Sequence, residues 1–434
     1  MEYTLFYLTK ELPVYFHVDT AGLWFFAAET LLWAAVFCFC PAYLKKKENK
    51  GRFYLFFFLV YGCMQGLNFA GNMFTFYLFY ELMTLLSLPL VLHEQTKEAV
   101  MAGLKYLFYS VFGACMVLFG LFALFSCTGS LTFVGGGIVG MLSGSENEVL
   151  LLWAAFCMIL GFSVKAGMFP FHGWLPTAHS IAPAPASAVL SAGIVKAGVL
   201  GIIRTVYYLV GPGNLQGTWV QQVWLILALI TIFMGSVLAY REKQLKKRLA
   251  YSTVSQVSYI LFGLAVMNGQ AFTGALLHAV GHVFMKGSLF LFAGAVITQT
   301  GKTGAEELKG IGREMPLTLW GFTIAALGLI GIPPAAGFLS KWYLAEGALD
   351  SGLSVFSWLG PVILLVSAVF TAGYLLPISM RGFLPGEETK VRGKKEPSWQ
   401  MLFPILLLAL FSLLMGIFPG SMLNGIEEIT SVIF

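Results

Sequence analysis

The chain has 434 residues, of which 58% are hydrophobic and only 11% charged, and its formal net charge is +5. Because about a quarter of the residues in an average soluble domain are charged, this composition excludes a soluble globular protein. Apolar runs of about 18 residues or more recur along the whole chain, which predicts an all-α polytopic membrane protein. A membrane β-barrel would instead show alternating segments of about ten residues.

Hydropathy along the chain predicts about twelve transmembrane helices. An even number of spans places both ends of the chain on the same side of the membrane. The predicted spans cover residues 21–44, 53–70, 72–93, 103–127, 150–169, 184–211, 222–240, 249–267, 272–299, 316–345, 357–380 and 399–420.

These spans divide the chain into four predicted parts. The parts are an N-terminal segment with the first transmembrane helix (1–52), a first inverted repeat (53–211), a second inverted repeat (222–380), and a cytoplasmic loop with the last helix (381–434). Each repeat holds five helices, and because five is an odd number the two repeats have opposite orientations.

The fourth helix of each repeat contains a proline break, at Phe169-Pro170 in the first repeat and at Pro333-Pro334 in the second. Proline frees backbone carbonyls, which at membrane depth is tolerated only where protein or water satisfies them. Broken helices at matching positions of an inverted repeat are typical of a transport site.

The basic residues predict which side of the membrane the loops face. Most of the 26 lysines and arginines fall in alternate loops, which lie at or near residues 45–52, 97, 241–248, 302–313 and 381–395. The positive-inside rule then places these loops in the cytoplasm and both termini outside, in a protein integral to the cytoplasmic membrane.

Several ionisable side chains lie within the predicted spans, where each costs at least about 2.5–3.5 kcal/mol on insertion scales and therefore indicates a function. Glu81 in FTFYLFYELMTLLSLPLV and Lys165 in GFSVKAGMFPFHGWLP are predicted to form a buried pair in which each partner keeps the other charged. Such a pair can act as a proton switch. The alternative is a fixed ion pair that only orients two helices.

A second group lies in GALLHAVGHVFMKGSLFLFAGAV, where His278, His282 and Lys286 recur at intervals of four and so share one helical stripe. Histidine titrates near neutral pH, and desolvation brings lysine toward that range, so the stripe can pass protons along through intervening water. The alternatives are a metal site and core histidines held by backbone or hydroxyl partners. No carboxylate accompanies the stripe, which argues against a metal.

Two further lysines extend the series toward a polar path through the protein. Lys196 follows the first break, and Lys341 lies seven residues beyond Pro334. His172 and His179 flank the first break on the predicted cytoplasmic side, where they either belong to a proton access path or cap the broken helix.

Four other charged side chains are expected to matter less. Glu29 and Glu346 lie nearer the outer ends of their helices. Lys105 and Arg204 lie near helix ends, from which long basic side chains can reach the membrane surface.

No cofactor or metal site is predicted. The six cysteines lie in or at the ends of apolar helices without a CxxC or Cys/His cluster, so we interpret them as packing residues. The sequence shows no nucleotide, flavin, haem or quinone motif. Redox chemistry is therefore expected on partner proteins, and no nucleic-acid partner is expected.

Four motifs and the helix of Glu81 together resemble one protein family. The motifs are KAGMFPFHGWLPTAHSIAPAPASA, KKRLAYSTVSQVSYI, HAVGHVFMKGSLFLFAGA and GIPPAAGFLSKW, and the resemblance extends over about residues 20–420. The family comprises the antiporter-like, proton-conducting membrane subunits shared by Mrp-type sodium/proton antiporters, respiratory complex I and membrane-bound energy-converting hydrogenases. The chain looks most similar to the D-type members of the Mrp antiporters and to the hydrogenase members.

The resemblance implies a mechanism. In the family, the glutamate at the position of Glu81 pairs with the lysine at Lys165, the middle lysine and histidine residues relay, and the lysine at Lys341 exchanges with the far side. Altered pairings move the ions, driven by redox chemistry in other subunits or by a sodium gradient.

The chain is expected to depart from the family in two ways. The family usually has fourteen core helices, of which the first two are expected to be absent here, exposing a face that a neighbouring subunit covers. The C-terminal lateral helix of the longest complex I member is also expected to be absent.

We therefore predict a proton-translocating subunit of a multisubunit membrane complex, either a redox-driven pump or an Mrp-type cation/proton antiporter. Its expected partners are other membrane subunits, the lipid bilayer, protons and, through the resemblance, Na⁺. The alternative is a structural membrane subunit that has kept the fold but lost conduction. That alternative predicts missing lysines or a missing Glu81, and none is missing.

Overall fold

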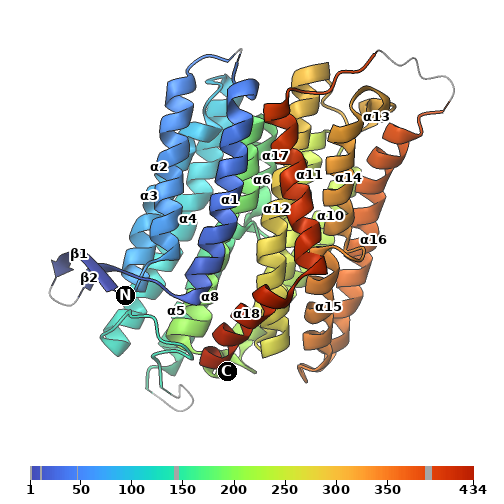
Figure 1. Ribbon diagram of the computed structural model, residues 1–434. Helices are drawn as coiled ribbons and strands as arrows, with labels where there is room; N and C mark the ends of the chain where they lie inside the picture. Colours follow the sequence, from blue (N-terminus) through green and yellow to red (C-terminus); the bar gives the residue numbers. More distant parts are fainter. Residues whose placement is uncertain (1, 10–11, 46, 141–145, 387–392) are drawn as a thin grey trace.

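The computed structural model describes the whole chain except residues 1, 10–11, 46, 141–145 and 387–392. The described residues form a bundle of long, roughly antiparallel helices with a small β-hairpin at its N-terminal end (Figure 1). Ten helical segments of the described part are long and apolar enough to cross a membrane, which confirms a polytopic helical membrane protein. The basic residues Lys10, Lys46, Lys390 and Arg392 lie outside the described residues.

The first half of the chain begins with the hairpin and continues through the first break. Its elements are β1 (Glu2–Thr9), β2 (Leu12–His17), α1 (Thr20–Tyr43), α2 (Lys50–Asn68), α3 (Met73–Val91), α4 (Lys97–Thr128), α5 (Glu148–Ala166), η1 (Phe171–Gly173), α6 (Trp174–Ile181), α7 (Ala184–Val189), η2 (Leu190–Ile194), α8 (Val195–Ile203), η3 (Arg204–Val210) and α9 (Pro212–Leu215). The segments η2 and η3 are π-helical turns inside one continuous helical rod that runs from α7 to η3.

The second half repeats the pattern of long helices around a second break. Its elements are α10 (Trp219–Arg241), α11 (Leu245–Val266), α12 (Gly269–Thr300), η4 (Glu306–Leu308), α13 (Ile311–Glu314), α14 (Pro316–Ile330), α15 (Ala336–Leu349), α16 (Val355–Phe383), α17 (Trp399–Ile417) and α18 (Gly420–Ile433).

Each of the twelve predicted spans coincides with a helix or with a broken helix. The tenth span is divided into α14 and α15, neither of which is long enough to cross a bilayer alone. The helix α2 has 19 residues but is less apolar than the ten clear spans. The division into two inverted five-helix repeats stays a prediction.

Two elements were not predicted from the sequence, the β-hairpin and α18. Both lie at the end of the bundle where the two termini lie (Figure 1). The helix α18 is amphipathic, since its buried residues Met422, Ile426, Ile429 and Ile433 recur at helical spacing on one face. That face packs against α1 and α12, so α18 covers this end of the bundle instead of spanning it.

Burial divides the helices into a core and a shell. The rod from α7 to η3 is entirely buried, and α11 and α12 are almost entirely buried. In α1, α3, α4, α10, α16 and α17, by contrast, half of the span or less is buried. A helix that is apolar on all sides belongs in the middle of a bundle. The core helices carry Lys196, His278, His282 and Lys286, which places these ionisable side chains at the centre of the protein.

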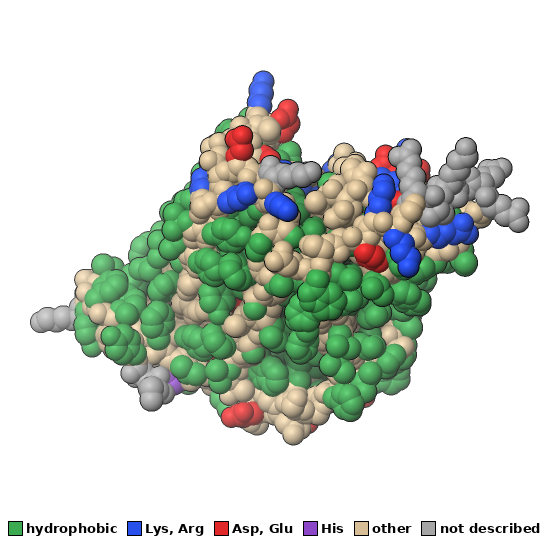
Figure 2. All heavy atoms as spheres, turned by 45° about the horizontal axis from the view of Figure 1, so that its top comes forward, with side chains coloured by type: hydrophobic (Ala, Val, Ile, Leu, Met, Phe, Trp, Pro, Cys, Tyr) green, Lys and Arg blue, Asp and Glu red, His purple; other side chains and the backbone are tan. Residues whose placement is uncertain are grey.

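The basic loops gather at the end of the bundle opposite both termini. Figure 2 shows Lys and Arg side chains at this end, beyond a broad band of hydrophobic side chains. Backbone hydrogen bonds join these loops, for example from Ala305 N to the Lys243 carbonyl and from Gly310 N to the Arg381 carbonyl. We call this the basic end and the opposite end the terminal end. That the basic end faces the cytoplasm stays a prediction.

Candidate functional site

The two breaks share one backbone design. The helix α5 stops at Gly167 and α14 stops at Gly331, both in the left-handed conformation, with φ of 79° and 94°. In each case the next residue closes the helix end with a backbone hydrogen bond, from Met168 N to the Ser163 carbonyl and from Ile332 N to the Leu327 carbonyl. Glycine accepts this conformation without steric cost, so the glycine in each motif ends the helix in mid-membrane.

Side chains from beyond each break satisfy the carbonyl groups that the break leaves free. At the first break, Trp174 Nε1 donates to the Val164 carbonyl at 2.8 Å. At the second break, Lys341 Nζ donates to the Leu329 and Ile330 carbonyls, both at 2.8 Å. An ammonium group at a helix C-terminus also interacts favourably with the helix dipole. Lys341 therefore lies directly at the second break, as its sequence position suggested.

The close approach of α15 to α14 depends on Gly337. A Cβ atom at this position would lie 1.9 Å from the Gly328 carbonyl oxygen. Gly337→Ala is therefore expected to push α15 away from α14 and to cost about 1–3 kcal/mol of stability, the usual cost of overpacking. The cost is measured by thermal unfolding of the detergent-solubilised protein. The matched control is Gly62→Ala in α2, because a Cβ atom there meets nothing within 4 Å. Equal stability of the two variants would contradict this account.

Lys165 lies in the last turn of α5, and hydroxyl groups on α4 bind its amino group. Its Nζ donates to Tyr106 Oη at 2.8 Å and to Ser110 Oγ at 3.1 Å. Tyr106 Oη in turn lies 2.7 Å from Ser87 Oγ on α3, which donates to the Thr84 carbonyl at 3.0 Å. A continuous hydrogen-bonded chain thus runs from Lys165, which is only 1% exposed, across α4 into α3.

Glycine contacts bring α4 and α5 close enough for these hydrogen bonds. A Cβ atom at Gly161 would lie 2.4 Å from the Gly113 carbonyl oxygen, and one at Gly113 would lie 2.7 Å from the Gly161 carbonyl oxygen. Reciprocal small residues of this kind let membrane helices pack backbone to backbone. The amino group of Lys165, one turn from Gly161, therefore reaches Ser110 without leaving the bundle.

Glu81 is near Lys165 but does not bind it directly. The two side chains form no ion pair within 4.0 Å, although the charge of Lys165 acts on Glu81. The ring of Tyr80, the residue before Glu81, lies 5.6 Å from the Lys165 amino nitrogen. Glu81 Oε1 is buried and has no hydrogen-bond partner. In this structure, therefore, Lys165 acts on Glu81 only through its charge and not through a direct contact. Hydroxyl groups bind Lys165, and one carboxylate oxygen of Glu81 has no partner.

Lys196 follows the π-helical turn η2, and this turn explains one of its contacts. A π-turn shifts the backbone hydrogen bonds by one residue, and such turns are common at functional sites. The Ser191 carbonyl, five residues before Lys196, accepts a hydrogen bond from Lys196 Nζ at 3.3 Å. The same Nζ is hydrogen-bonded to His282 Nδ1 on α12, at 2.5 Å. The structure thus brings together Lys196 and the predicted histidine stripe, which lie 86 residues apart in the sequence.

The two histidines of the stripe are buried completely. The ring centroids of His278 and His282 lie 6.1 Å apart, and His278 Nδ1 lies 2.9 Å from Ser340 Oγ on α15. The Nε2 atoms of both rings are buried without a hydrogen-bond partner. Ser340 is the residue before Lys341, and the charge of Lys341 acts on His278. The histidines therefore connect Lys196 to the second break.

Lys286, one turn beyond His282, binds α11. Its Nζ donates to Ser252 Oγ at 2.7 Å and to the Leu249 carbonyl at 2.9 Å. Ser252 Oγ also accepts a hydrogen bond from Tyr374 Oη at 2.7 Å. Lys286 thus contacts a serine–tyrosine pair, much as Lys165 contacts Tyr106 and Ser110.

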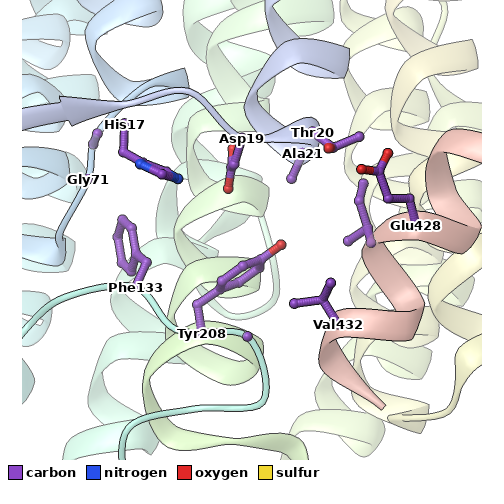
Figure 3. A pocket seen from close by; sticks show the side chains of 12 residues that line it. His17, Asp19, Thr20, Ala21, Gly71, Phe133, Tyr208, Glu428 and Val432 are labelled. Carbon is purple, nitrogen blue, oxygen red and sulfur yellow. The ribbon is translucent and has the colours of Figure 1, made fainter. Parts of the chain in front are cut away.

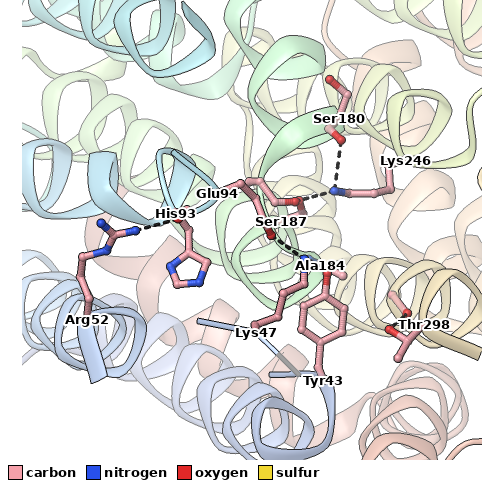
Figure 4. Close-up of polar contacts among 12 residues, drawn as sticks. Tyr43, Lys47, Arg52, His93, Glu94, Ser180, Ala184, Ser187, Lys246 and Thr298 are labelled. Carbon is pink, nitrogen blue, oxygen red and sulfur yellow. Dashed lines mark hydrogen bonds and ion pairs between the residues drawn. The ribbon is translucent and has the colours of Figure 1, made fainter. Parts of the chain in front are cut away.

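A polar pocket lies at the basic end. Its volume is about 290 Å³, and it is lined by residues that include Tyr43, Lys47, Glu94, Ser180 and Lys246. Figure 4 shows Lys47 paired with Glu94 and Lys246 donating to the Ser180 carbonyl. These contacts close the end of α6.

His179, next to Ser180, is fully buried and neither ring nitrogen has a partner. The charges of Lys246 and Lys286 both act on this ring. His179 therefore lies between the pocket, which Ser180 and Lys246 line, and Lys286. His172 is only partly buried and stacks on Phe169. The charge of Lys105 on α4 acts on His172, so His172 lies near α4 and not near Lys246 and Lys286.

A second pocket, of about 220 Å³, lies at the terminal end between α1, η3 and α18. Asp19, Tyr208 and Glu428 are among its lining residues, and Figure 3 shows them arranged around one space. Beneath it, both carboxylate oxygens of Asp19 bind the guanidinium of Arg204, with Nη2 to Oδ1 at 2.8 Å. Arg204 is 1% exposed, so the expectation that it reaches the membrane surface is wrong: Asp19 gives it a buried partner.

Asp19 also caps α1, because its Oδ1 accepts a hydrogen bond from Gly22 N at 2.8 Å. Burial raises the pKa of its carboxyl group, but Arg204 and the Gly22 amide lower it, and the net result is a pKa below the usual range. Asp19 therefore carries a negative charge at neutral pH.

Sequence reasoning missed the hydroxyl groups that contact the buried lysines and His278, directly or through another hydroxyl group. They are Ser87, Tyr106, Ser110, Ser252, Ser340 and Tyr374. Tyr106 and Ser110 are four residues apart on α4, and this spacing was a usable signal. Glu29, which the sequence placed nearer the outer end of its helix, is only 1% exposed.

Comparison with known proteins relates the whole bundle to antiporter-like subunits. Residues 70–371 match the family model described as NADH:quinone oxidoreductase/Mrp antiporter, TM. The chain is 33% identical over 394 residues to NADH-quinone oxidoreductase subunit N of Desulforudis audaxviator, covering 88% of this chain and 77% of that protein.

A second relative is Na⁺/H⁺ antiporter subunit A1 of Staphylococcus aureus, which is 33% identical over 436 residues. This alignment covers 95% of the chain but only 53% of the relative, so the chain spans about half the length of that relative. Among solved structures, the Mrp complex of a Dietzia species contains a chain that superposes with a TM-score of 0.86 at 21% identity, covering 100% of this chain and 87% of that one.

Proposed function

Because the chain belongs to the NADH:quinone oxidoreductase/Mrp antiporter transmembrane family and is an antiporter-like membrane subunit, we propose that it translocates protons along its buried lysines and histidines. The observation that carries this proposal is the hydrogen bond between Lys196 and His282 at the centre of a row of lysines and histidines inside the bundle. A protein that merely fills a place in a complex has no need of three buried lysines and a fourth, partly buried one, given the cost of each. The four are Lys165, Lys196, Lys286 and Lys341.

Pairwise interactions connect the ionisable groups from Lys286 to Lys341. The charge of Lys196 acts on Lys286, and Lys196 is hydrogen-bonded to His282. His282 and His278 lie one turn apart on α12, and the charge of Lys341 acts on His278. Each step therefore links two groups that can gain or lose a proton.

The first half joins this path where α5 and α8 touch. A Cβ atom at Gly198, two residues after Lys196, would lie 3.2 Å from the Lys165 Cβ. When Lys165 holds its proton, its ammonium group donates to Tyr106 and Ser110. When it releases the proton, it becomes an acceptor, and the charge that acts on Glu81 disappears. The couple of Glu81 and Lys165 can therefore switch the first half between two charge states.

Protons enter, in this proposal, through the pocket at the basic end and reach Lys286 through His179. The basic loops support a cytoplasmic position for this end and an outside position for both termini. Lys341 lies beside a cavity of about 330 Å³ that Gly331 and Trp342 also line, which provides room for exchange at the second break.

The parent assembly is a membrane complex of several subunits. The printed names of both relatives are those of subunits, and the superposed structure is a complex, which supports this inference. The Staphylococcus relative is named a Na⁺/H⁺ antiporter subunit. Measuring proton flux with and without Na⁺ separates a sodium-coupled exchange from a redox-driven pump.

The proposal is tested by Lys286→Met in the assembled complex, reconstituted in proteoliposomes. Methionine preserves the length of the side chain but cannot carry a proton. We expect coupled proton flux to fall on the order of 10²-fold or more, the range for a positioned acid–base group. The control is Lys309→Met in an exposed loop of the basic end. Unchanged flux in Lys286→Met would favour the alternative, a structural subunit that does not conduct.

A further inference from the structure

Glu29 of α1 is a buried carboxylate that the path described above does not use. It is 1% exposed, and one oxygen, Oε2, accepts a hydrogen bond from Asn68 Nδ2 of α2 at 2.8 Å. The other oxygen, Oε1, is buried without any partner. A carboxylate is rarely left in this state unless a charge nearby compensates it.

Lys196 is the described basic group whose charge acts on Glu29, although the two side chains form no ion pair within 4.0 Å. Glu29 is the carboxylate whose charge acts on Lys196, and Lys196 in turn acts on Glu29. The helix α1 comes close to Lys196 because it packs against α12 and η2. In this contact, Leu32 lies against Gly287 and Trp33 lies against Gly193. Glu29 lies one turn before Trp33, and Lys196 lies one turn after Gly193. Because the two helices run antiparallel, with Ala184 near Tyr43 and Arg204 near Asp19, both side chains lie on the same side of the contact between Trp33 and Gly193.

The charge balance at the centre of the bundle makes this contact important. Lys196 is surrounded by groups that carry or can gain positive charge, namely His282, His278 and Lys286. Of the described carboxylates, Glu29 is the one that opposes them at Lys196. Uncompensated positive charges in a dry interior are expensive, so the ionisation of Lys196 depends on the state of Glu29.

We propose that Glu29 is the proton-exchanging partner of Lys196, a second carboxylate–lysine couple supplied by a helix outside the two predicted repeats. This inference deepens the proposed function and rests on it. In the exchange, the two side chains approach each other, an N–H bond of the Lys196 ammonium group breaks and an O–H bond forms at Glu29 Oε1. A charged pair becomes a neutral amine and a neutral acid, and the reverse step restores the pair.

Asn68 positions the carboxylate for this exchange. Its amide group holds Oε2 and also donates to Gln65 Oε1 at 3.1 Å, which fixes the orientation of the amide on α2. The free oxygen Oε1 is then the one available to accept a proton. Because Asn68 cannot take up a proton itself, the hydrogen bond orients Glu29 without competing for the proton.

The test compares Glu29→Gln with Glu29→Asp in the assembled, reconstituted complex. Glutamine keeps an oxygen for Asn68 but cannot accept a proton, whereas aspartate keeps the carboxylate. We expect Glu29→Gln to reduce coupled proton flux on the order of 10²-fold and Glu29→Asp to retain much of it. Glu346→Gln on α15 is the matched control and should leave the flux unchanged. Equal flux in Glu29→Gln and the wild type would overturn the proposal.

A second measurement does not depend on transport. Infrared difference spectra of the purified complex follow the C=O stretching band of protonated carboxyl groups during acidification. We expect one band to vanish in Glu29→Gln and its pH dependence to change in Lys196→Met. A complex that transports no protons but shows this coupling would refute the proposed function and leave the couple intact. A band unaffected by Lys196→Met would overturn the couple, whatever the flux.

Discussion

Lys165→Met is expected to abolish coupled proton flux, with a loss on the order of 10²–10⁴-fold. The substitution removes the only group of α5 that can carry a proton beside Tyr106 and Ser110, and it deprives Glu81 of the charge that acts on it. Flux is measured in proteoliposomes that contain the assembled complex. Assembly is verified on the same preparation by size-exclusion chromatography, so that loss of transport is not confused with loss of the complex.

Lys165→Arg separates a proton relay from a fixed ion pair. Arginine keeps the positive charge but does not release its proton in proteins. A relay therefore fails in Lys165→Arg, whereas a fixed electrostatic contact survives. The matched control is Lys105→Met on α4, whose amino group binds Thr177 near the basic end. Normal flux in Lys165→Arg and Lys165→Met alike would disprove a role for Lys165 in transport.

Asp19→Asn is expected to have the largest effect on stability, about 3–5 kcal/mol, which is the usual cost of breaking a buried ion pair from one side. Asparagine can still cap α1 through its side-chain oxygen, so the substitution removes the charge and spares the cap. What remains is the buried guanidinium of Arg204, whose other contacts are the rings of Phe133 and Tyr208. The loss is measured as a decrease in the unfolding free energy of the detergent-solubilised protein.

Two controls define the origin of this effect. Asp350→Asn, at an exposed position, should change stability by less than about 0.5 kcal/mol. Adding Arg204→Met to Asp19→Asn should recover part of the loss, because no unpaired charge then remains in the interior. A double variant less stable than Asp19→Asn would contradict this account.

The same pair predicts how stability depends on pH. The pKa of Asp19 is lower in the folded protein than in the unfolded chain, where it is about 3.9. The contribution of Asp19 is therefore complete above pH 4 to 5 and is lost as the pH falls through the folded-state pKa. Asp19→Asn should lack this acid-induced loss, which acid titration of the unfolding midpoint measures.

The breaks show how closely local sequence and tertiary structure cooperate. Glycine and proline determine where α5 and α14 stop, and both stops were predicted within a few residues. The partners of the freed carbonyls differ, with the Trp174 indole at one break and the Lys341 amino group at the other. No local pattern indicates which side chain reaches back, because the choice depends on how the second half-helix packs.

The sequence by itself determined the class of protein, the helices and most of the ionisable groups, because a bilayer imposes strong and local rules. Apolar length predicts a span, proline and glycine predict a break, and each charge within a span is costly enough to indicate a function. These rules needed no knowledge of which helices touch. The family was identified from the four motifs and the Glu81 helix, and the comparisons confirm it.

Only the tertiary structure decided the partners of those groups, since partners come from helices far apart in the chain. It placed Lys165 among hydroxyl groups instead of against Glu81, joined Lys196 to His282, and gave Arg204 a partner in Asp19. It also showed that Glu29 is buried and hydrogen-bonded to Asn68. A buried charge needs a partner that compensates it. The sequence position of the charge does not identify that partner, because the packing of the helices determines which side chains meet.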